Sequence, residues 1–192
     1  MLCAKQTVHI PFTNEKATIM KYSLLFTTLM LGLSINSFAA EAKNLKVEEQ
    51  VVIDAPASKV WAKASNFGDL GAWHPAVKKT EITSGTNNQK GAVRVLTLQD
   101  DGTIKEKLLA YNPKSMSYKY EIIEGVLPVS HYVSTVTVKA QGENKSLVVW
   151  KGTFKRKDTS AKPAAGQDDE AAVKSITGVY RGGLDNLKKI SE

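Results

Sequence analysis

The chain has 192 residues, of which 42% are hydrophobic and 23% charged, and its formal net charge is +7. Its single cysteine, Cys3, precedes the segment that we expect to fold, so composition excludes a disulfide, a thiol nucleophile and a cysteine metal site in that domain. The lysines are scattered along predicted strands, which favours a solvated surface. An anionic membrane face or an acidic protein is the alternative partner for this charge.

The N-terminal residues are typical of a secretory signal peptide. Met20-Lys21 is a short basic start, residues 24–35 form an apolar run, and Ser37-Phe-Ala39 offers small residues to a signal peptidase. We expect cleavage after Ala39, with Ala40 and Ala42 as alternatives, and we interpret residues 1–19 as an upstream extension of the reading frame. The apolar run is too short to span a bilayer stably, although an uncleaved anchor is the alternative. This predicts an exported domain over residues 40–192, periplasmic or secreted, without stable membrane insertion and without a nucleic-acid partner.

The first part of that domain predicts a strand followed by two short helical segments. Leu45–Ile53 alternates as an edge strand, and Pro56 suits the start of a helix whose apolar residues recur at helical spacing. Gly68 and Gly71 end that helix, and a short helical turn follows. The apolar residues of these two segments are Val60, Trp61, Ala64, Phe67, Leu70 and Trp73.

Five further strands are predicted from period-two alternation, with lysine and threonine on the outer face. They span Val93–Leu98, Thr103–Tyr111, Ser117–Ile123, Ser130–Lys139 and Leu147–Arg156. Turn residues such as Gly, Asn, Asp and Pro occupy the connections between them. One-sided strands of this kind form an antiparallel sheet with a single buried face. We expect Arg94, Leu96, Ile104, Glu106, Leu108 and Ala110 on that face, among others.

The last segment predicts one long helix after a polar linker at 158–169. Asp168, Asp169 and Glu170 lie at its start and Lys188 and Lys189 at its end, as the helix dipole favours. Its apolar stripe comprises Ala172, Ile176, Val179, Tyr180, Gly183, Leu184, Leu187 and Ile190. Together the segments predict an α+β fold: a curved antiparallel sheet wrapped round a long C-terminal helix, with two short helices between the first and second strands.

The chain resembles the START-like, helix-grip superfamily, also called SRPBCC, over about residues 45–190. The resemblance is carried by residues 53–61 (IDAPASKVW), 67–75 (FGDLGAWHP), 149–154 (VWKGTF) and 179–187 (VYRGGLDNL). It is strongest to the polyketide cyclase/dehydrase-like branch, and an exported form is similar to the MxaD-like periplasmic group. The resemblance implies that the domain holds a small hydrophobic ligand between sheet and helix. We also expect a monomer without a cofactor. Residues 104–108 (IKEKL) and 131–138 (HYVSTVTV) carry a more distant resemblance, to the plant abscisic acid receptors. It implies that residues 125–129 cover the mouth of the pocket.

Inward-facing aromatic residues and the gap at Gly183 suggest a pocket on the order of a few hundred Å³. The candidate ligand-binding residues are Trp73, His74, Arg94, Leu96, Glu106, Leu108, Tyr118, Tyr120, Ile122, Leu127, Tyr132, Ser134, Trp150, Ile176, Val179 and Gly183. Several of these residues also have a purely structural interpretation. Arg94 and Glu106 either pair with each other or orient a ligand, because neither charge is stable when buried alone. The tyrosines either contact a ligand or fill the core, and Gly183 either leaves room for a ligand or allows close packing.

Catalytic candidates are His74, Glu106 and Tyr132, as general acid or base groups. A lone histidine is more often a hydrogen-bonded structural residue, and no nucleophile elbow, phosphate-binding loop or metal-ligand cluster accompanies these residues. The sequence therefore favours an exported binding protein over an enzyme. The alternatives are a cyclase- or dehydratase-like enzyme using the same pocket, and an accessory protein that docks on a periplasmic redox enzyme of the methanol-dehydrogenase type.

Overall fold

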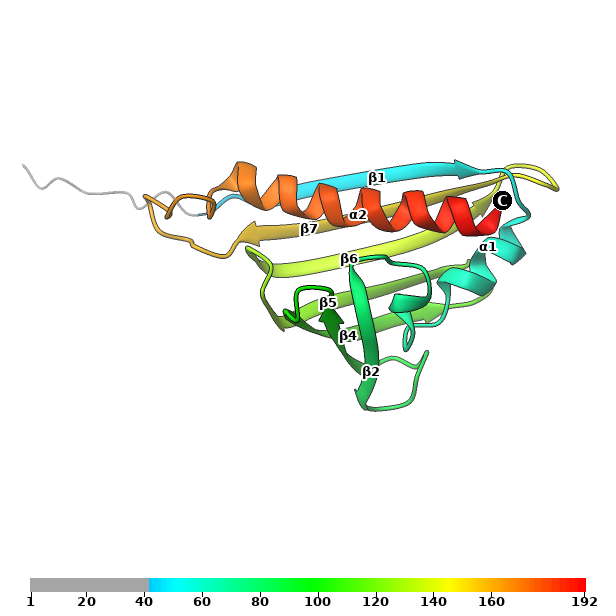
Figure 1. Ribbon diagram of the computed structural model, residues 1–192, viewed down its shortest axis with the longest axis horizontal. Coiled ribbons are helices and arrows are strands. Elements are labelled where there is room, and N and C mark those ends of the chain that lie inside the picture. The colour runs from blue at the N-terminus through cyan, green and yellow to red at the C-terminus, as the bar shows by residue number, and fades with distance from the viewer. Residues whose placement is uncertain (1–41) are drawn as a thin grey trace, which may run out of the picture. The chain divides into compact units, whose positions relative to one another are not determined.

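The computed structural model describes residues 42–192, so the predicted signal peptide lies outside the described residues. Seven strands and three helical segments follow one another in this range (Figure 1). In chain order they are β1 (Leu45–Ile53), α1 (Ala57–Ala64), η1 (Leu70–Ala72), β2 (Val77–Ser84), β3 (Val93–Leu98), β4 (Thr103–Asn112), β5 (Ser117–Gly125), β6 (Val129–Ala140), β7 (Ser146–Arg156) and α2 (Asp169–Ser191).

The α+β prediction is confirmed, with one strand more than expected. The missed strand is β2, at one edge of the sheet, where every residue from Lys78 to Ser84 is exposed or half-buried. A strand with few buried residues has no clear alternating apolar pattern, and a bulge after Val77 further disrupts the alternation.

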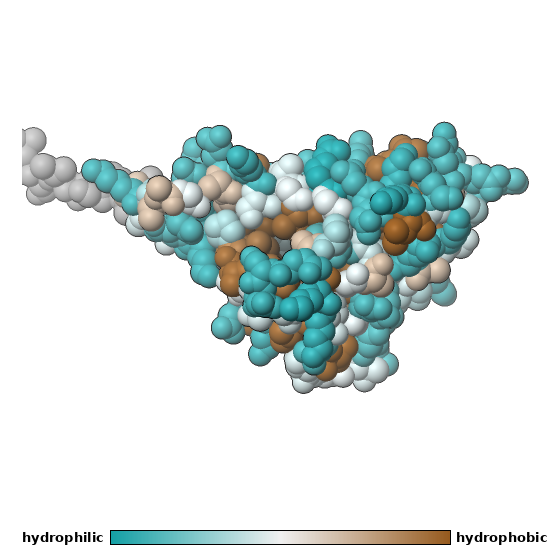
Figure 2. All heavy atoms as spheres, in the orientation of Figure 1, coloured by the Kyte–Doolittle hydropathy of each residue, from teal (hydrophilic) through white to brown (hydrophobic). Residues whose placement is uncertain are grey.

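All seven strands form one antiparallel sheet in the order β1-β7-β6-β5-β4-β3-β2. Figure 1 shows α2 lying along β1 and β7, while the sheet curves away through β6, β5 and β4. The buried side chains of the strands, α1 and α2 form one hydrophobic core. On the face seen in Figure 2, apolar residues gather around a hollow below α2. No helix among the described residues has both the length and the apolar character needed to cross a membrane.

Helix α2 has the predicted charges at both ends. Asp168 caps it, and its carboxylate accepts a hydrogen bond from Ala171 N at 2.8 Å. The predicted stripe is buried except at two positions: Val179 is half-buried and Ile190 is 37% exposed. The prediction for Ile190 was wrong because Ser191, one residue on, faces the core in its place.

A bulge also corrects the predicted inner face of β4. The pairing with β5 shifts register between Leu108 and Ala110, so the alternation is interrupted there. Ala110 is exposed, contrary to prediction, and Tyr111 packs against the core with its ring 5.8 Å from that of Trp61.

Strands β5 and β6 separate at one end, which opens the sheet beside the core. Their pairing runs from Ser117 opposite Thr137 to Glu121 opposite Val133 and stops there. Beyond that point β5 pairs only with β4, and β6 only with β7. His131, in the left-handed region with φ 51°, lies in the bulge where β6 changes register. The result is a cleft of about 270 Å³ between the two strands.

Candidate functional site

A cavity lies between the inner face of the sheet and α2, at the place that the sequence predicts for a pocket. It has a volume of about 70 Å³. Its lining includes the predicted residues His74, Leu96, Glu106, Tyr120, Ile122, Leu127, Tyr132, Trp150, Ile176 and Val179. Leu70, Ala76, Val77, Leu98 and Ile104 also line it and were not among the predicted site residues. The remaining candidates, Trp73, Arg94, Leu108, Tyr118, Ser134 and Gly183, are buried but do not line this cavity.

The cavity is smaller than the few hundred Å³ that the sequence suggested. Its volume of about 70 Å³ gives room for a few water molecules or a very small organic molecule. Aromatic rings fill much of the interior around this cavity. Trp150 stacks on Tyr180 with ring centroids 4.5 Å apart. Tyr118 packs against Trp61, Phe67 and Tyr120.

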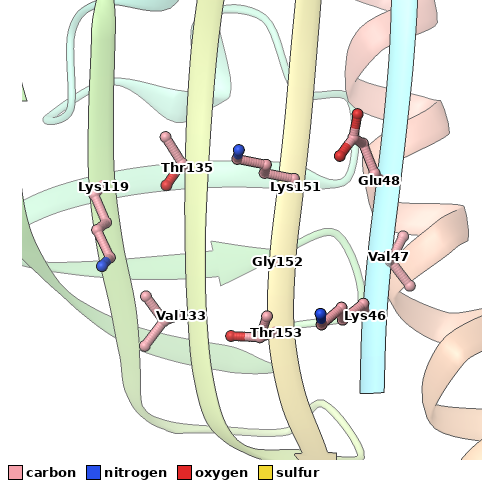
Figure 3. A pocket seen from close by; sticks show the side chains of 9 residues that line it. All are labelled: Lys46, Val47, Glu48, Lys119, Val133, Thr135, Lys151, Gly152 and Thr153. Atoms are coloured by element: carbon pink, nitrogen blue, oxygen red, sulfur yellow. The ribbon is translucent and has the colours of Figure 1, made fainter. Parts of the chain in front are cut away.

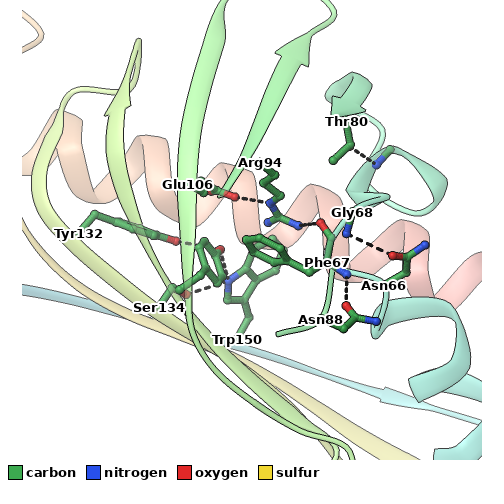
Figure 4. Close-up of polar contacts among 12 residues, drawn as sticks. Asn66, Phe67, Gly68, Thr80, Asn88, Arg94, Glu106, Tyr132, Ser134 and Trp150 are labelled. Carbon is green, nitrogen blue, oxygen red and sulfur yellow. Dashed lines mark hydrogen bonds and ion pairs between the residues drawn. The ribbon is translucent and has the colours of Figure 1, made fainter. Parts of the chain in front are cut away.

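One end of the cavity holds a buried cluster of hydroxyl groups, shown in part in Figure 4. We call it the hydroxyl cluster; it comprises Tyr120, Tyr132, Ser134 and Tyr180, joined by the indole N–H of Trp150. The phenol oxygens of Tyr132 and Tyr180 are 2.7 Å apart, and that of Tyr180 lies 2.9 Å from Ser134 Oγ. Tyr120 OH is 3.3 Å from Tyr132 OH. Trp150 Nε1 donates to Ser134 Oγ at 2.9 Å and to Tyr120 OH at 3.1 Å.

The direction of each hydrogen bond in this cluster follows from Ser134. Its hydroxyl donates to the carbonyl oxygen of Lys151 at 2.9 Å, so Tyr180 must donate to Ser134. Tyr132 then donates to Tyr180, and Tyr120 donates to Tyr132. Tyr120 and Tyr132 also line the cavity, so this series of hydrogen bonds borders the space that a ligand would occupy.

Burial keeps these phenols protonated. Desolvation raises the pKa of Tyr180 to about 12. Desolvation also raises the pKa of Tyr120 and of Tyr132 well above the ordinary value, and neighbouring acidic groups add to the effect. The cluster therefore offers neutral hydroxyl groups, suited to hydrogen-bonding a ligand.

Arg94 and Glu106 form a buried ion pair at another side of the cavity (Figure 4). They face each other across β3 and β4, and Arg94 Nε donates to Glu106 Oε2 at 2.6 Å. Burial raises the pKa of Glu106, and the guanidinium of Arg94 opposes that rise. Burial alone would lower the pKa of Arg94, but the carboxylate of Glu106 raises it overall. Of the two, only Glu106 lines the cavity.

A loop residue completes the surroundings of Arg94. Arg94 Nη1 donates to the carbonyl oxygen of Phe67 at 2.6 Å, and the guanidinium carbon of Arg94 lies 4.0 Å from the centroid of the Phe67 ring. Phe67 N in turn donates to Asn88 Oδ1 at 2.9 Å, which fixes the loop. Arg94 Nη2 has no hydrogen-bond partner in the described chain.

His74 lines the cavity with both ring nitrogens engaged. Nε2 donates to the carbonyl oxygen of Val179 at 2.9 Å, and Nδ1 accepts from Ala76 N at 3.2 Å. This pattern requires the neutral imidazole with its proton on Nε2. Burial lowers the pKa of His74, which agrees with a neutral ring. In this arrangement His74 ties the loop after η1 to α2.

Two glycines allow helix and sheet to approach closely. A Cβ atom at Gly183 would lie 2.6 Å from His74 Cδ2 and 2.8 Å from Trp150 Cζ3. A Cβ atom at Gly152 would overlap the hydroxyl of Tyr180. Gly183 therefore gives space to the rings of His74 and Trp150, and the cavity lies to one side of it.

Tyr180 is the member of the site that sequence reasoning assigned to the core alone. Its side chain is fully buried on α2, and its hydroxyl joins Tyr132 to Ser134. The available signal was its phenol group on an otherwise apolar stripe, because a buried tyrosine hydroxyl requires a partner.

Residues 44–192 match the family model described as polyketide cyclase/dehydrase and lipid transport. The chain belongs to this family. Its fold and its match agree with the SRPBCC resemblance seen in the sequence. None of the curated proteins compared with the chain matches it.

Several solved structures are similar to the chain. The protein XoxI from Bacillus cereus is 31% identical with a TM-score of 0.65, over 76% of this chain and 94% of that one. An uncharacterised protein from Bacillus thuringiensis is also 31% identical, with a TM-score of 0.67 over 77% and 98% of the two chains. The Zhui aromatase/cyclase from Streptomyces sp. R1128 is 17% identical with a TM-score of 0.62, over 78% and 94%, and shares the fold.

Proposed function

We propose that this protein binds a small apolar or amphipathic molecule in the cavity between the sheet and α2. The observation that carries the proposal is the composition of the cavity wall. Most lining residues are apolar, while Tyr120, Tyr132 and Glu106 provide a few polar groups at defined places. Ligand sites of this kind bury an apolar body and fix its orientation through a small number of hydrogen bonds. A ligand with a hydroxyl at one end suits the hydroxyl cluster, because Tyr120 and Tyr132 donate their protons within the cluster and their phenol oxygens can still accept a hydrogen bond.

A lipid or polyketide-sized ligand would require the cavity to open. The cleft between β5 and β6 shares Ile122 and Tyr132 with the cavity, so these two side chains separate the two spaces. Leu127, in the connection between the strands, also lines the cavity. We infer that a ligand enters where β5 and β6 separate, by displacing this connection and the side chain of Ile122.

Binding accounts for the site better than catalysis does. Both nitrogens of His74 are hydrogen-bonded to backbone groups, and Glu106 is paired with Arg94. Burial raises the pKa of the Tyr132 phenol, which disfavours its action as a base near neutrality. The aromatase/cyclase among the similar structures shares too little sequence to carry its activity over to this chain.

Export is part of the same proposal and rests on the Met20–Ala39 pattern. An exported carrier would hold its ligand in the periplasm or outside the cell. The accessory role with a periplasmic redox enzyme rests on the MxaD-like resemblance; it would involve the protein's surface and does not compete with a ligand in the cavity.

Binding of the neutral dye N-phenyl-1-naphthylamine to the purified protein tests the cavity together with its opening between β5 and β6, because the dye is too large for the closed cavity of about 70 Å³. We expect fluorescence enhancement at micromolar dye, and a loss of affinity of about tenfold or more in Val179→Trp, because the new ring would fill the cavity. Val173→Trp is the matched control, since Val173 is also a half-buried valine of α2 but does not line the cavity. Equal affinity in a folded Val179→Trp variant would contradict the proposal.

A further inference from the structure

A further concave site lies on the outer face of the sheet, away from α2. It has a volume of about 390 Å³. Figure 3 shows its side chains on four neighbouring strands, β5, β6, β7 and β1. We call it the outer groove; it is lined by Lys46, Val47, Glu48, Lys119, Val133, Thr135, Lys151, Gly152 and Thr153.

The strand register explains why charged residues from distant parts of the chain meet here. Lys151 lies opposite Glu48 on one side and Thr135 on the other, and Thr135 lies opposite Lys119. Lys46 lies opposite Thr153 in the adjacent row. Neighbouring strands are about 4.8 Å apart, so the three ammonium groups are within reach of one depression. Lysines from three strands therefore converge on a groove that holds a single carboxylate, that of Glu48.

The groove carries a net positive charge, because three lysines share it with the single carboxylate of Glu48. None of the three forms a salt bridge within residues 42–192, whereas Lys78, Lys79, Lys145 and Lys188 each do. Like charges grouped on one face of a sheet repel one another and reduce stability. A bound anion would remove this repulsion. The hydroxyl groups of Thr135 and Thr153 add hydrogen-bond donors between the lysines.

We propose that the outer groove binds an acidic segment of a partner protein in extended conformation. Such a segment presents carboxylates at alternate residues on one side, which suits lysines distributed along and across strands. A membrane is the less suitable partner, because the site is concave and, among its side chains, only Val133 is an apolar group on the outer face. The proposal does not depend on the cavity ligand, since the two sites lie on opposite faces of the sheet.

Fluorescence anisotropy with a fluorescein-labelled peptide of alternating glutamate and threonine tests the outer groove. We expect binding at low ionic strength that weakens as salt is added. The triple variant Lys46→Glu, Lys119→Glu and Lys151→Glu should bind the peptide about tenfold more weakly or worse. The matched control, Lys59→Glu, Lys90→Glu and Lys114→Glu, changes the net charge equally at exposed lysines outside the groove, and should bind within about twofold of the wild type.

Three results would overturn the proposal. One is an equal loss of affinity in both triple variants, which would show that net charge alone attracts the peptide. Another is the absence of binding at low salt in the folded wild type. The third is tighter binding to vesicles of phosphatidylcholine and phosphatidylglycerol than to the peptide, lost in the groove variant alone, which would assign the surface to a membrane. Circular dichroism of each variant verifies that it is folded.

Discussion

The phenol oxygens of Tyr132 on β6 and Tyr180 on α2 lie 2.7 Å apart, in a part of the core where both side chains are buried. This hydrogen bond joins the sheet to the long helix beside the cavity. Its partner bond, from Tyr180 to Ser134, makes Tyr180 the link between two strand residues. The hydroxyl cluster is thus both part of the core and the polar end of the proposed binding site.

Removal of the Tyr180 hydroxyl tests the stability that this link provides. In Tyr180→Phe the hydroxyls of Tyr132 and Ser134 each lose a partner while they stay buried, so we expect the free energy of unfolding to fall by about 1–3 kcal/mol. Urea denaturation measures this change. Tyr111→Phe is the control, because the Tyr111 hydroxyl makes no hydrogen bond within the described residues, and we expect a change below about 0.5 kcal/mol there. Equal effects in the two variants would contradict the role given to Tyr180.

The ion pair of Arg94 and Glu106 predicts that the effects of replacing the two residues on the free energy of unfolding are strongly non-additive. Either Arg94→Met or Glu106→Leu leaves an uncompensated buried charge and should cost about 3–5 kcal/mol in the free energy of unfolding. The double variant removes both charges and should cost much less than the sum of the two. Denaturation of the four proteins gives the coupling energy directly. An additive double variant would mean that the two charges are stabilised separately.

Alanine substitutions at Gly183 and at its neighbour Gly182 in α2 should change stability in opposite directions. Gly183→Ala places a methyl group against the rings of His74 and Trp150, so we expect a loss of about 1–3 kcal/mol in stability. Gly182→Ala meets nothing within 4 Å and should gain about 0.5–1 kcal/mol, because alanine favours the helix. Thermal unfolding of the two variants distinguishes them by the sign of the change in Tm. A stabilised Gly183→Ala variant would mean that His74 and Trp150 have room to move.

His74 predicts a pH dependence of stability with a definite sign. Burial lowers its pKa in the folded protein, so below about pH 6.5 the unfolded chain takes up a proton that the folded protein does not. Stability should therefore be full above that pH and fall by at most about 1.4 kcal/mol for each pH unit below it, until the folded-state pKa is reached. His74→Gln should show a smaller fall between pH 7.5 and 5.5, as measured by urea denaturation. The two proteins differ only at residue 74, so the difference between their profiles reports on that imidazole.

The sequence predicted the fold because one-sided strands and an amphipathic helix leave clear periodic patterns. It failed where backbone irregularities change the period, as at the bulge that exposes Ala110 and turns Tyr111 inward. It also missed β2, whose residues are too exposed to carry an apolar pattern.

The candidate site was predictable in its location but not in its size. Alternation identified Tyr120, Tyr132 and Glu106 as inward-facing residues, and all three are buried. How much space remains between them depends on ring packing, such as the stacking of Trp150 on Tyr180, which no spacing rule gives. The pairing of Arg94 with Glu106 was one of two interpretations open from the sequence, and only the register of β3 and β4 places them opposite each other.

Intermolecular nuclear Overhauser effects between bound N-phenyl-1-naphthylamine and the protein test the proposed binding site most directly. In the saturated complex we predict contacts from the dye's ring protons to Leu96, Tyr120 and Ile176, all of which line the cavity. Contacts only to exposed apolar residues such as Ile123 and Val126, with none to the cavity lining, would contradict it.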